Sequence, residues 1–300
     1  MNVLILSRSR TVASTRRLVD AAKALGHRAS VVNPVDVELV FDGAGAALFT
    51  RGKPLPAVDA VIPRISASGA SYALALAEQF LLGGVTVLNT PAAIGRSRNL
   101  VRCLQTLVAG GVPVPPSVTA RDTGELKALV GRVGGLPVLA KVAGGRERKS
   151  TLRCERPEAL EAALDAVLGL GEQLVLQQLV QPVVREVRYA VVGGSSVACV
   201  EKVRKARPRR QGKKARVQFR AGTGDQPGRA VAEAAARTLG LEFCSVDLVM
   251  TAKGAWVVDV DATPPLGPFA ALPGADVARA VMLRVQQLVS GVASRGVSLP

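Results

Sequence analysis

The stretch WVVDVDATPP, residues 256–265, places two aspartates two positions apart at the end of an apolar run, and two prolines then end the run. The segment VDLVM, residues 246–250, comes shortly before it. Only TAKGA separates the two segments, and a connection of that length is typical of a β-hairpin. The sequence therefore predicts two antiparallel strands folded back on each other.

The pairing of this hairpin brings like charges together. With Met250 opposite Trp256, Asp247 faces Asp259. Because side chains alternate between the two faces of a strand, apolar and acidic residues separate. The expected apolar face comprises Val246, Leu248, Met250, Trp256, Val258 and Val260, and the expected acidic face comprises Asp247, Asp259 and Asp261.

Carboxylates gathered on one face of a ribbon repel one another unless a cation lies among them. Their oxygens are hard ligands suited to Mg²⁺ or Mn²⁺, and Mg²⁺ usually takes one or two of them, with phosphates and water completing its shell. The three aspartates are therefore candidate ligands of a divalent metal ion. The spacing leaves open an alternative, a solvated polar face whose charges are balanced by arginines.

The first 90 residues alternate strand and helix patterns. We expect strands at 2–6, 29–32 and 60–65, and helices at 12–25 and 70–82. This order is typical of an α/β domain built on βαβ units with a parallel sheet. The turn after the first strand, SRSRTVAS, contains no glycine and so lacks the dinucleotide-binding fingerprint.

The rest of the chain predicts two further lobes. A helix at 92–109 is followed by VPVPP, whose prolines hold the backbone extended. Further strands are expected at 138–142, 173–179, 185–192, 196–203 and in the hairpin at 245–261, and further helices at 157–168, 228–239 and 275–290. The predicted division is an N-terminal domain at 1–90, a connecting helix at 91–111, a central lobe at 112–180 and a C-terminal lobe at 181–300.

Composition and charge restrict the class of partner. The chain has 39 Lys and Arg against 23 Asp and Glu, a formal charge of +16, which attracts polyanions at low salt. No window approaches the roughly 18 uncharged apolar residues of a membrane span. The four cysteines lack metal-site or redox spacing. We expect a cytoplasmic globular protein without a membrane partner, and the oligomeric state stays open.

Several strings, taken in order, resemble the RimK-like ligases of the ATP-grasp superfamily. They are ILSR at 5–8, DAVIPRI at 59–65, RSRNLVRCLQTL at 96–107, VLAKV at 138–142, VRYAVVG at 187–193, and VDLVM followed by VVDVDATP. The resemblance implies a pre-ATP-grasp domain followed by two α+β ATP-grasp lobes that clamp ATP between them. Members of this family activate a carboxylate as an acyl phosphate, which an amine then attacks, and the type members add glutamate to a protein C-terminus.

The resemblance also implies roles for individual residues. Asp247, Asp259 and Asp261 match the metal-ligand positions, and Lys141 matches a lysine that contacts the ATP phosphates. Gln177, Gln178, Leu179 and Val180 match the adenine-binding hinge, and Gly144, Gly145, Arg146 and Lys149 lie in the phosphate loop. Glu186 and Arg188 match an acidic and a basic position near ATP and substrate, and Arg188 is the catalytic candidate. The alternatives are a solvent-facing lysine for Lys141 and a cross-strand ion pair for Glu186 and Arg188.

The chain departs from the family pattern at the phosphates. In AGGRERKSTLR, residues 143–153, only two glycines remain of a glycine-rich loop, and cations replace its flexible part. Those cations either bind phosphate directly or mark a loop that no longer closes. Leu100 replaces a second phosphate lysine, and Arg98 or Arg102 would substitute for it only if the helix rotated. Asp259 stands where Glu is usual, and Asp261 where Asn is common.

These departures leave two hypotheses. The first is an ATP- and Mg²⁺-dependent carboxylate–amine ligase that acts through an acyl phosphate and adds an amino acid, such as glutamate, to an acidic peptide or protein. The second is a catalytically degenerate ATP-grasp protein that binds a polyanionic partner. The segment from Lys202 to Arg220 contains ten Lys or Arg residues and one aromatic, Phe219. It fits an acidic peptide, and it fits RNA or the ribosome less well because stacking residues are few.

Overall fold

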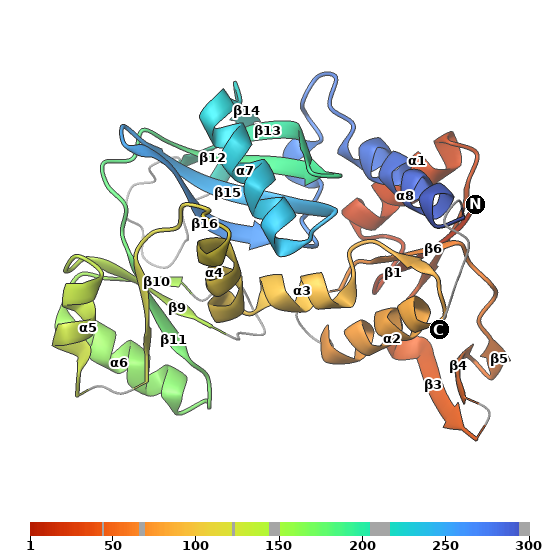
Figure 1. The fold of residues 1–300 in the computed structure, drawn as a ribbon, viewed down its shortest axis with the longest axis horizontal. Helices are drawn as coiled ribbons and strands as arrows, with labels where there is room; N and C mark the ends of the chain where they lie inside the picture. The colour runs from red at the N-terminus through yellow and green to blue at the C-terminus, as the bar shows by residue number, and fades with distance from the viewer. Residues whose placement is uncertain (44, 66–69, 122–123, 144–150, 205–216, 294–300) are drawn as a thin grey trace.

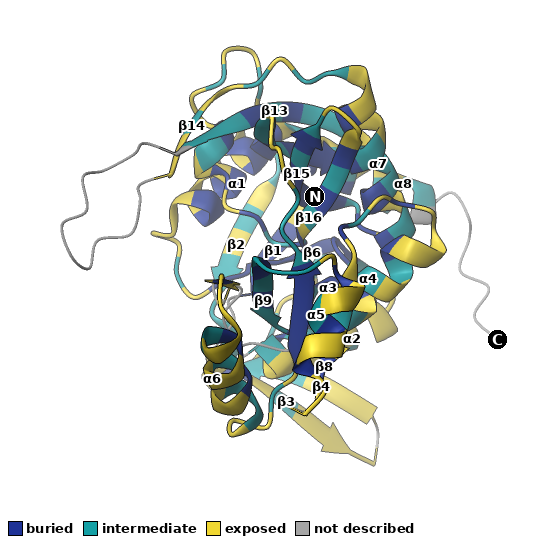
Figure 2. Cartoon of the chain, turned by 90° about the vertical axis from the view of Figure 1, so that its left-hand side faces the viewer, coloured by how far each residue is buried: buried dark blue, intermediate teal, exposed yellow. Residues whose placement is uncertain are grey.

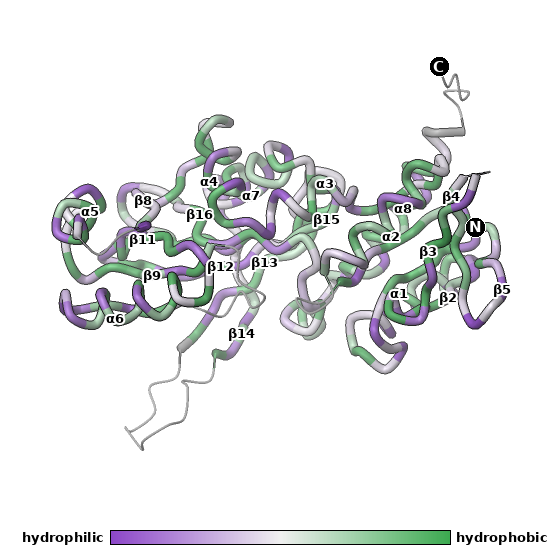
Figure 3. The backbone as a smooth tube through the Cα atoms, turned by 90° about the horizontal axis from the view of Figure 1, so that it is seen from below, coloured by the Kyte–Doolittle hydropathy of each residue, from purple (hydrophilic) through white to green (hydrophobic). Residues whose placement is uncertain are grey.

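The computed structural model describes residues 1–43, 45–65, 70–121, 124–143, 151–204 and 217–293. It has an N-terminal domain with a parallel sheet and two lobes with antiparallel sheets, which confirms the expected α/β class. Figure 3 shows these three parts in a row, with the C-terminal lobe between the central lobe and the N-terminal domain. None of the described helices is long and apolar enough to cross a membrane.

The N-terminal domain is built on a parallel sheet in the order β2-β1-β6-β7. Its strands are β1 (Asn2–Leu6), β2 (Arg28–Val32), β6 (Ala60–Pro63) and β7 (Thr86–Val87), and its helices are α1 (Ala13–Ala24) and α2 (Ala70–Leu82). Alternate residues of β1 serve opposite faces, since Val3 and Ile5 pack in a cluster with α1 whereas Leu4 and Leu6 pack with α2. Helices on both faces explain the continuous apolar run of β1, in which every residue after Asn2 is buried (Figure 2).

A small antiparallel sheet was not predicted. The short helix η1 (Pro34–Asp36) leads into β3 (Val37–Asp42), β4 (Gly45–Thr50) and β5 (Lys53–Pro54), which pair in sequence order. Most of these residues are exposed or half-buried, so the segment lacks the apolar pattern that marks a core strand. The hairpin projects from the N-terminal domain, as Figure 1 shows.

The predicted continuous helix at 92–109 is wrong. The chain forms two helices, α3 (Pro91–Arg98) and α4 (Leu100–Ala109), separated at Asn99. Asn99 has an extended backbone, and its side chain accepts a hydrogen bond from the backbone N–H of Arg102 at 3.0 Å. It is therefore the N-cap of α4, a position that asparagine favours.

The central lobe has a four-stranded antiparallel sheet in the order β10-β9-β11-β8. Its elements are β8 (Ser117–Ala120), α5 (Leu126–Arg132), β9 (Val138–Val142), β10 (Thr151–Cys154), α6 (Pro157–Leu168) and β11 (Leu174–Gln178). Strand β9 and helix α6 lie where they were predicted, whereas β8, β10 and α5 were missed. Val138 and Ala140 pack with Leu160 and Leu164 of α6, so Lys141 lies on the opposite face of the sheet.

The C-terminal lobe has a five-stranded antiparallel sheet in the order β14-β13-β12-β15-β16. Its elements are β12 (Arg185–Val192), β13 (Ser195–Arg204), β14 (Val217–Ala221), α7 (Gln226–Leu239), β15 (Phe243–Thr251), β16 (Gly254–Asp261), η2 (Gly267–Phe269) and α8 (Val277–Ala293). Helix α8 lies beside α1 in Figure 1, and Met282 packs in one cluster with Leu18 and Phe243. The C-terminal helix thus shares a core with the N-terminal domain.

Candidate functional site

The hairpin at the end of the C-terminal lobe brings Asp247 opposite Asp259, as predicted. The predicted register near the turn is wrong, however, because Met250 pairs with Ala255 and not with Trp256. The pairing at the turn differs from the prediction while the pairing of the aspartates agrees with it, because the register shifts by one residue between them. The prediction was therefore right about the aspartates and wrong about the path of the strand that leads to them.

The shift is a β-bulge at Val258. Leu248 pairs with Val257 and its neighbour Asp247 pairs with Asp259, so Val258 has no partner of its own. The bulge changes which residues face the core, since Val257 is buried whereas Val258 is half-buried. Trp256 is half-buried as well. Assigning Trp256 and Val258 to the apolar face was therefore wrong.

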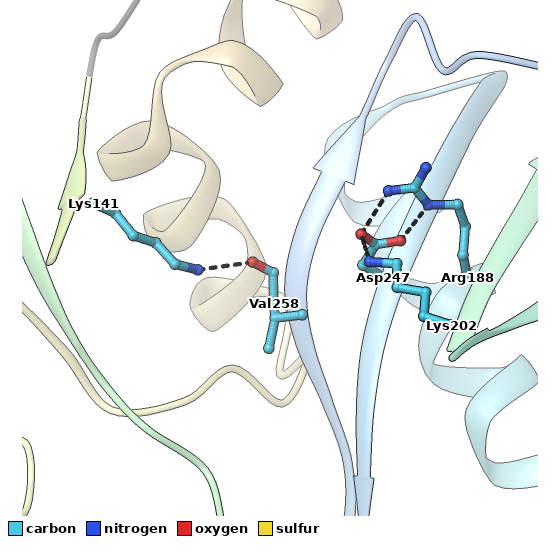
Figure 4. Close-up of polar contacts among 5 residues, drawn as sticks. All are labelled: Lys141, Arg188, Lys202, Asp247 and Val258. Atoms are coloured by element: carbon cyan, nitrogen blue, oxygen red, sulfur yellow. Dashed lines mark hydrogen bonds and ion pairs between the residues drawn. The ribbon is translucent and has the colours of Figure 1, made fainter. Parts of the chain in front are cut away.

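Asp247 is held by two cations from neighbouring strands. Arg188 of β12 donates from Nε to Oδ1 at 2.6 Å and from Nη2 to Oδ2 at 2.8 Å, and Lys202 of β13 also donates to Oδ2. Figure 4 shows both cations converging on this carboxylate. Burial would raise the pKa of Asp247, but the hydrogen bonds from Arg188 and the charge of Lys202 hold that pKa below its ordinary value of 3.8. Arg188, the catalytic candidate, is therefore fixed by a bidentate ion pair.

Asp259 and Asp261 have different surroundings from Asp247. Asp259 is exposed, and Asp261 is half-buried and accepts a hydrogen bond from the backbone N–H of Thr263 at 2.9 Å. Within the described ranges, no three His, Cys, Asp or Glu side chains lie close enough together to hold one metal ion. Two carboxylates on alternate residues of one strand nevertheless suit Mg²⁺, which usually takes only one or two from the protein.

A pocket of about 170 Å³ lies where the central and C-terminal lobes meet; we call it the interlobe pocket. Its lining includes Arg98 and Leu100 from α3 and α4, Lys141 and Gln177 from β9 and β11, and Asp259 from β16. It therefore combines two basic side chains with a carboxylate at the junction of three separate parts of the chain.

Lys141 reaches across the lobes within this pocket. Its Nζ donates to Oε1 of Gln177 at 2.6 Å and to the backbone oxygen of Val258 at 3.1 Å, a contact drawn in Figure 4. Gln177 is buried and donates in turn to Oγ of Ser117 at 3.0 Å. Burial lowers the pKa of Lys141, and the negative charges of Asp259 and Asp247 partly offset that effect. The bulge thus presents the carbonyl of its extra residue to the lysine.

The break between α3 and α4 determines which side chains enter the interlobe pocket. Arg98, the last residue of α3, lines the pocket without the helix rotation that the sequence analysis required. Leu100 begins α4, lines the same pocket and donates its backbone N–H to the oxygen of Ala143 at 2.8 Å. Arg102 is exposed and does not line it. The asparagine cap at 99 was the signal that would have revealed this arrangement.

The other predicted site residues that the structure describes do not line the interlobe pocket, and the rest fall outside the described ranges. Gln178 ends β11, its backbone N–H bonds to the oxygen of Pro116 at 2.8 Å, and Leu179 and Val180 continue toward β12 as half-buried residues. Glu186 is half-buried on β12. Gly144, Gly145, Arg146, Arg148 and Lys149 fall outside the residues that the structure describes.

Two family models match the chain. A model described as RimK PreATP-grasp domain matches residues 1–94, and one described as RimK-like ATP-grasp domain matches residues 97–285. Among curated proteins, the probable alpha-L-glutamate ligase of Serratia proteamaculans (strain 568) is 33% identical over 293 residues, covering 96% of each chain. The protein of the same name from Sodalis glossinidius (strain morsitans) is 33% identical over 296 residues, covering 98% of this chain and 100% of its own.

Solved structures share the fold. A RimK domain ATP-grasp protein from Sphaerobacter thermophilus has a TM-score of 0.73 at 24% identity, covering 94% of this chain and 98% of its own. The ATP-grasp ligase PsnB, complexed with minimal precursor, Mg and ADP, has a TM-score of 0.72 at 18% identity, covering 96% of this chain and 97% of its own. The expected ATP-grasp fold, with its N-terminal pre-ATP-grasp domain, is confirmed.

Proposed function

Because the chain belongs to the RimK-like ATP-grasp family of ATP-dependent ligases, we propose that it joins glutamate to an acidic peptide or protein, using ATP and Mg²⁺. The name shared by its full-length relatives, probable alpha-L-glutamate ligase, supports glutamate as the amino acid. The formal charge of +16 supports an acidic acceptor, because opposite charge speeds encounter and favours binding.

One observation carries this proposal: Lys141, Arg98 and Asp259, from three separate elements, line the same interlobe pocket. A nucleoside triphosphate needs cations beside its phosphates and a carboxylate for the metal ion that accompanies it. The pocket offers both in one place. A site that bound only a polyanion would gain nothing from the carboxylate.

Asp259 and Asp261 would hold the magnesium ion. Asp247, the third ligand that the family resemblance implies, has both of its oxygens bonded to Arg188 and Lys202. An ion held by Asp259 and Asp261 would supply positive charge that offsets the negative charge of the ATP phosphates. In this scheme the ion pair of Asp247 fixes the ribbon on which the other two carboxylates stand.

The reaction would proceed in two displacements. A carboxylate oxygen of the acceptor attacks the γ-phosphorus of ATP and ADP leaves, which gives an acyl phosphate. The amine of glutamate then attacks the acyl carbon, loses a proton, and inorganic phosphate leaves. Because both steps move negative charge between oxygens, the task of the protein is mainly to position the reactants and stabilise that charge.

The chain's own residues would divide this work. Lys141 and Arg98 would hold phosphates, with Gly144, Gly145, Arg146 and Lys149 closing over them. The hinge at 177–180 would hold adenine, largely through its backbone, and Glu186 would lie beside the nucleotide. Arg188, held by Asp247, would stabilise the charge of the acyl phosphate from the C-terminal lobe.

Calorimetric titration of ATP with and without Mg²⁺ tests the proposal. The wild type and Asp259→Ala are compared, with Asp20→Ala as control because Asp20 is an exposed residue of α1. We expect Mg²⁺-dependent ATP binding in the wild type and the control and at least about tenfold weaker binding in Asp259→Ala. We also expect the wild type to release ADP when both glutamate and an acidic acceptor peptide are present. An affinity for ATP that does not depend on Mg²⁺ and is unchanged in Asp259→Ala would instead support a catalytically degenerate protein that binds a polyanion.

A further inference from the structure

A second pocket, of about 160 Å³, opens in the N-terminal domain; we call it the strand-end pocket. Its lining includes Ser7 and Arg8 after β1, Thr15 in the first turn of α1, Arg64 after β6, and Thr263 after β16. One buried water needs roughly 10–15 Å³ of such space, so the pocket has room for a small organic molecule.

The topology of the sheet favours a ligand at this place. The chain leaves β1 through α1 to β2 on one side, whereas β6 pairs with β1 on the other side. Connections that diverge in this way leave a crevice at the carboxyl ends of the strands, where open α/β sheets bind their ligands. Helix α1 also begins here without a side-chain cap, so its first N–H groups favour an anion.

Arg64 gives independent evidence for a ligand. Its Nη2 donates to the backbone oxygen of Pro264 at 2.7 Å, but its Nη1 is buried without a hydrogen-bond partner among the described residues. Buried polar atoms in proteins are nearly always hydrogen-bonded, and an unpaired cationic donor is especially unfavourable. A missing acceptor is therefore indicated at this atom.

The chemistry of the lining points to a carboxylate. The planar guanidinium of arginine matches a carboxylate in two-point contact, and Arg8 adds a second positive charge at the exposed side. Burial lowers the pKa of Arg64 to about 10, an effect that the charge of Asp261 partly offsets, so the side chain stays charged at neutral pH. The hydroxyls of Ser7 and Thr15 lie 2.7 Å apart and can share a further oxygen.

The strand-end pocket also adjoins Asp261, one of the two proposed metal carboxylates. Oγ1 of Thr263 lies 3.5 Å from Oδ1 of Asp261 and 3.5 Å from the backbone oxygen of Ile65. A molecule in this pocket would therefore lie next to the end of β16, while the ATP phosphates are assigned to the interlobe pocket.

We propose that the strand-end pocket binds a free carboxylate of the glutamate substrate, with Arg64 as its principal ligand. This inference rests on the proposed ligase function for the identity of the amino acid. It adds a substrate-binding role for a part of the chain outside the two ATP-grasp lobes.

Calorimetric titration of L-glutamate tests the pocket without relying on turnover. The wild type is compared with Arg64→Lys and Arg64→Gln, with and without a nonhydrolysable ATP analogue and Mg²⁺. The control is Arg28→Gln, since Arg28 is an exposed residue at the opposite end of the sheet. We expect roughly 10- to 100-fold weaker binding in Arg64→Gln, a smaller loss in Arg64→Lys and no change in the control.

Two amide analogues identify the carboxylate. Glutamine lacks the free side-chain carboxylate, and isoglutamine lacks the free α-carboxylate. The analogue that lacks the carboxylate bound by Arg64 should bind the wild type weakly, and its affinity should be the same for Arg64→Gln. Unchanged glutamate affinity in folded Arg64→Lys or Arg64→Gln, no glutamate binding by the wild type in either condition, or displacement of glutamate by inorganic phosphate alone would overturn the proposal.

Steady-state kinetics separate failure of the pocket from failure of the ligase function. If the strand-end pocket binds glutamate, Arg64→Lys should raise KM for glutamate, while KM for ATP should stay within about twofold of the wild-type value. Ligase activity with an unchanged KM for glutamate would overturn the pocket and leave the function standing. If the wild type binds glutamate through Arg64 but releases no ADP, the pocket proposal stands and the ligase function is overturned.

Discussion

Asp247 and Asp259 are direct partners on adjacent strands, yet their surroundings differ. Asp247 is buried, with a side chain 7% exposed, and is bonded to Arg188 and Lys202. Asp259 is exposed and lines the interlobe pocket with Lys141. Two like charges that a sequence pattern treats as equivalent are thus divided between a structural ion pair and a surface that can receive a ligand.

The order of the strands explains this division. Strand β15 lies inside its sheet and β16 at the edge, so Asp247 has β12 and β13 on one side as sources of cations. Among the described strands, none pairs with β16 on its outer side, and Asp259 lines the interlobe pocket with residues of the central lobe instead. Position across the sheet, more than spacing along the chain, determines which carboxylate is paired with cations and which is exposed at the interlobe pocket.

The largest effect should come from neutralising Asp247. Asp247→Asn leaves two half-buried cations without their buried counter-charge, which should lower the free energy of unfolding by about 3–5 kcal/mol. The matched variant Asp259→Asn is exposed and should change that energy by less than about 0.5 kcal/mol. Urea unfolding measures both, and equal losses would remove the distinction between the two aspartates.

Acid should abolish the contribution of Asp247. Its pKa is lower in the folded protein than the ordinary 3.8, so the unfolded chain takes up a proton first as the pH falls. The stabilisation is therefore complete above about 3.8 and declines as the pH falls toward the lowered value. Unfolding free energies of the wild type and Asp247→Asn should converge over this window; a constant difference would show that the charge of Asp247 is not its cause.

On the ligand side of the comparison, Lys141→Met should weaken ATP binding roughly 10- to 100-fold, because charge-assisted hydrogen bonds contribute about 1.5–3 kcal/mol. The control is Lys253→Met, in the exposed turn between β15 and β16. Fluorescence titration with a labelled ATP analogue measures the affinity. If both variants bind ATP equally well, Lys141 serves only to join the lobes through Val258.

The smallest effect should come from Leu100→Lys. This change adds a cation to a pocket that already holds Lys141 and Arg98, so we expect MgATP affinity to rise by no more than about tenfold. Arg102→Leu, at an exposed position outside the pocket, should leave affinity unchanged. A weaker affinity in Leu100→Lys would mean that the apolar side chain itself is needed for the nucleotide.

Much of the fold was predictable because its signals are local. The parallel sheet, the central strand with Lys141 and the final hairpin follow from apolar period, glycines and prolines. The bulge at Val258 was not predictable, since register depends on pairing with another strand. The break at Asn99 was readable as a helix cap but was hidden within a continuous helical pattern.

The charged partners of Asp247 also required the structure. Arg188 and Lys202 come from two other strands, and only the sheet order brings them to one carboxylate. The sequence analysis considered arginines as counter-charges but could not say which residues would act. Similarly, the role proposed for Arg64 depends on the burial of its Nη1 without a hydrogen-bond partner in the part of the chain that the structure describes, which is a property of the folded chain.

The most direct test of the division between the two aspartates is Mn²⁺ binding, followed by electron paramagnetic resonance in the presence of a nonhydrolysable ATP analogue. The account predicts nucleotide-dependent Mn²⁺ binding by the wild type and at least about tenfold weaker binding by Asp259→Asn. Wild-type Mn²⁺ affinity in Asp259→Asn would contradict it.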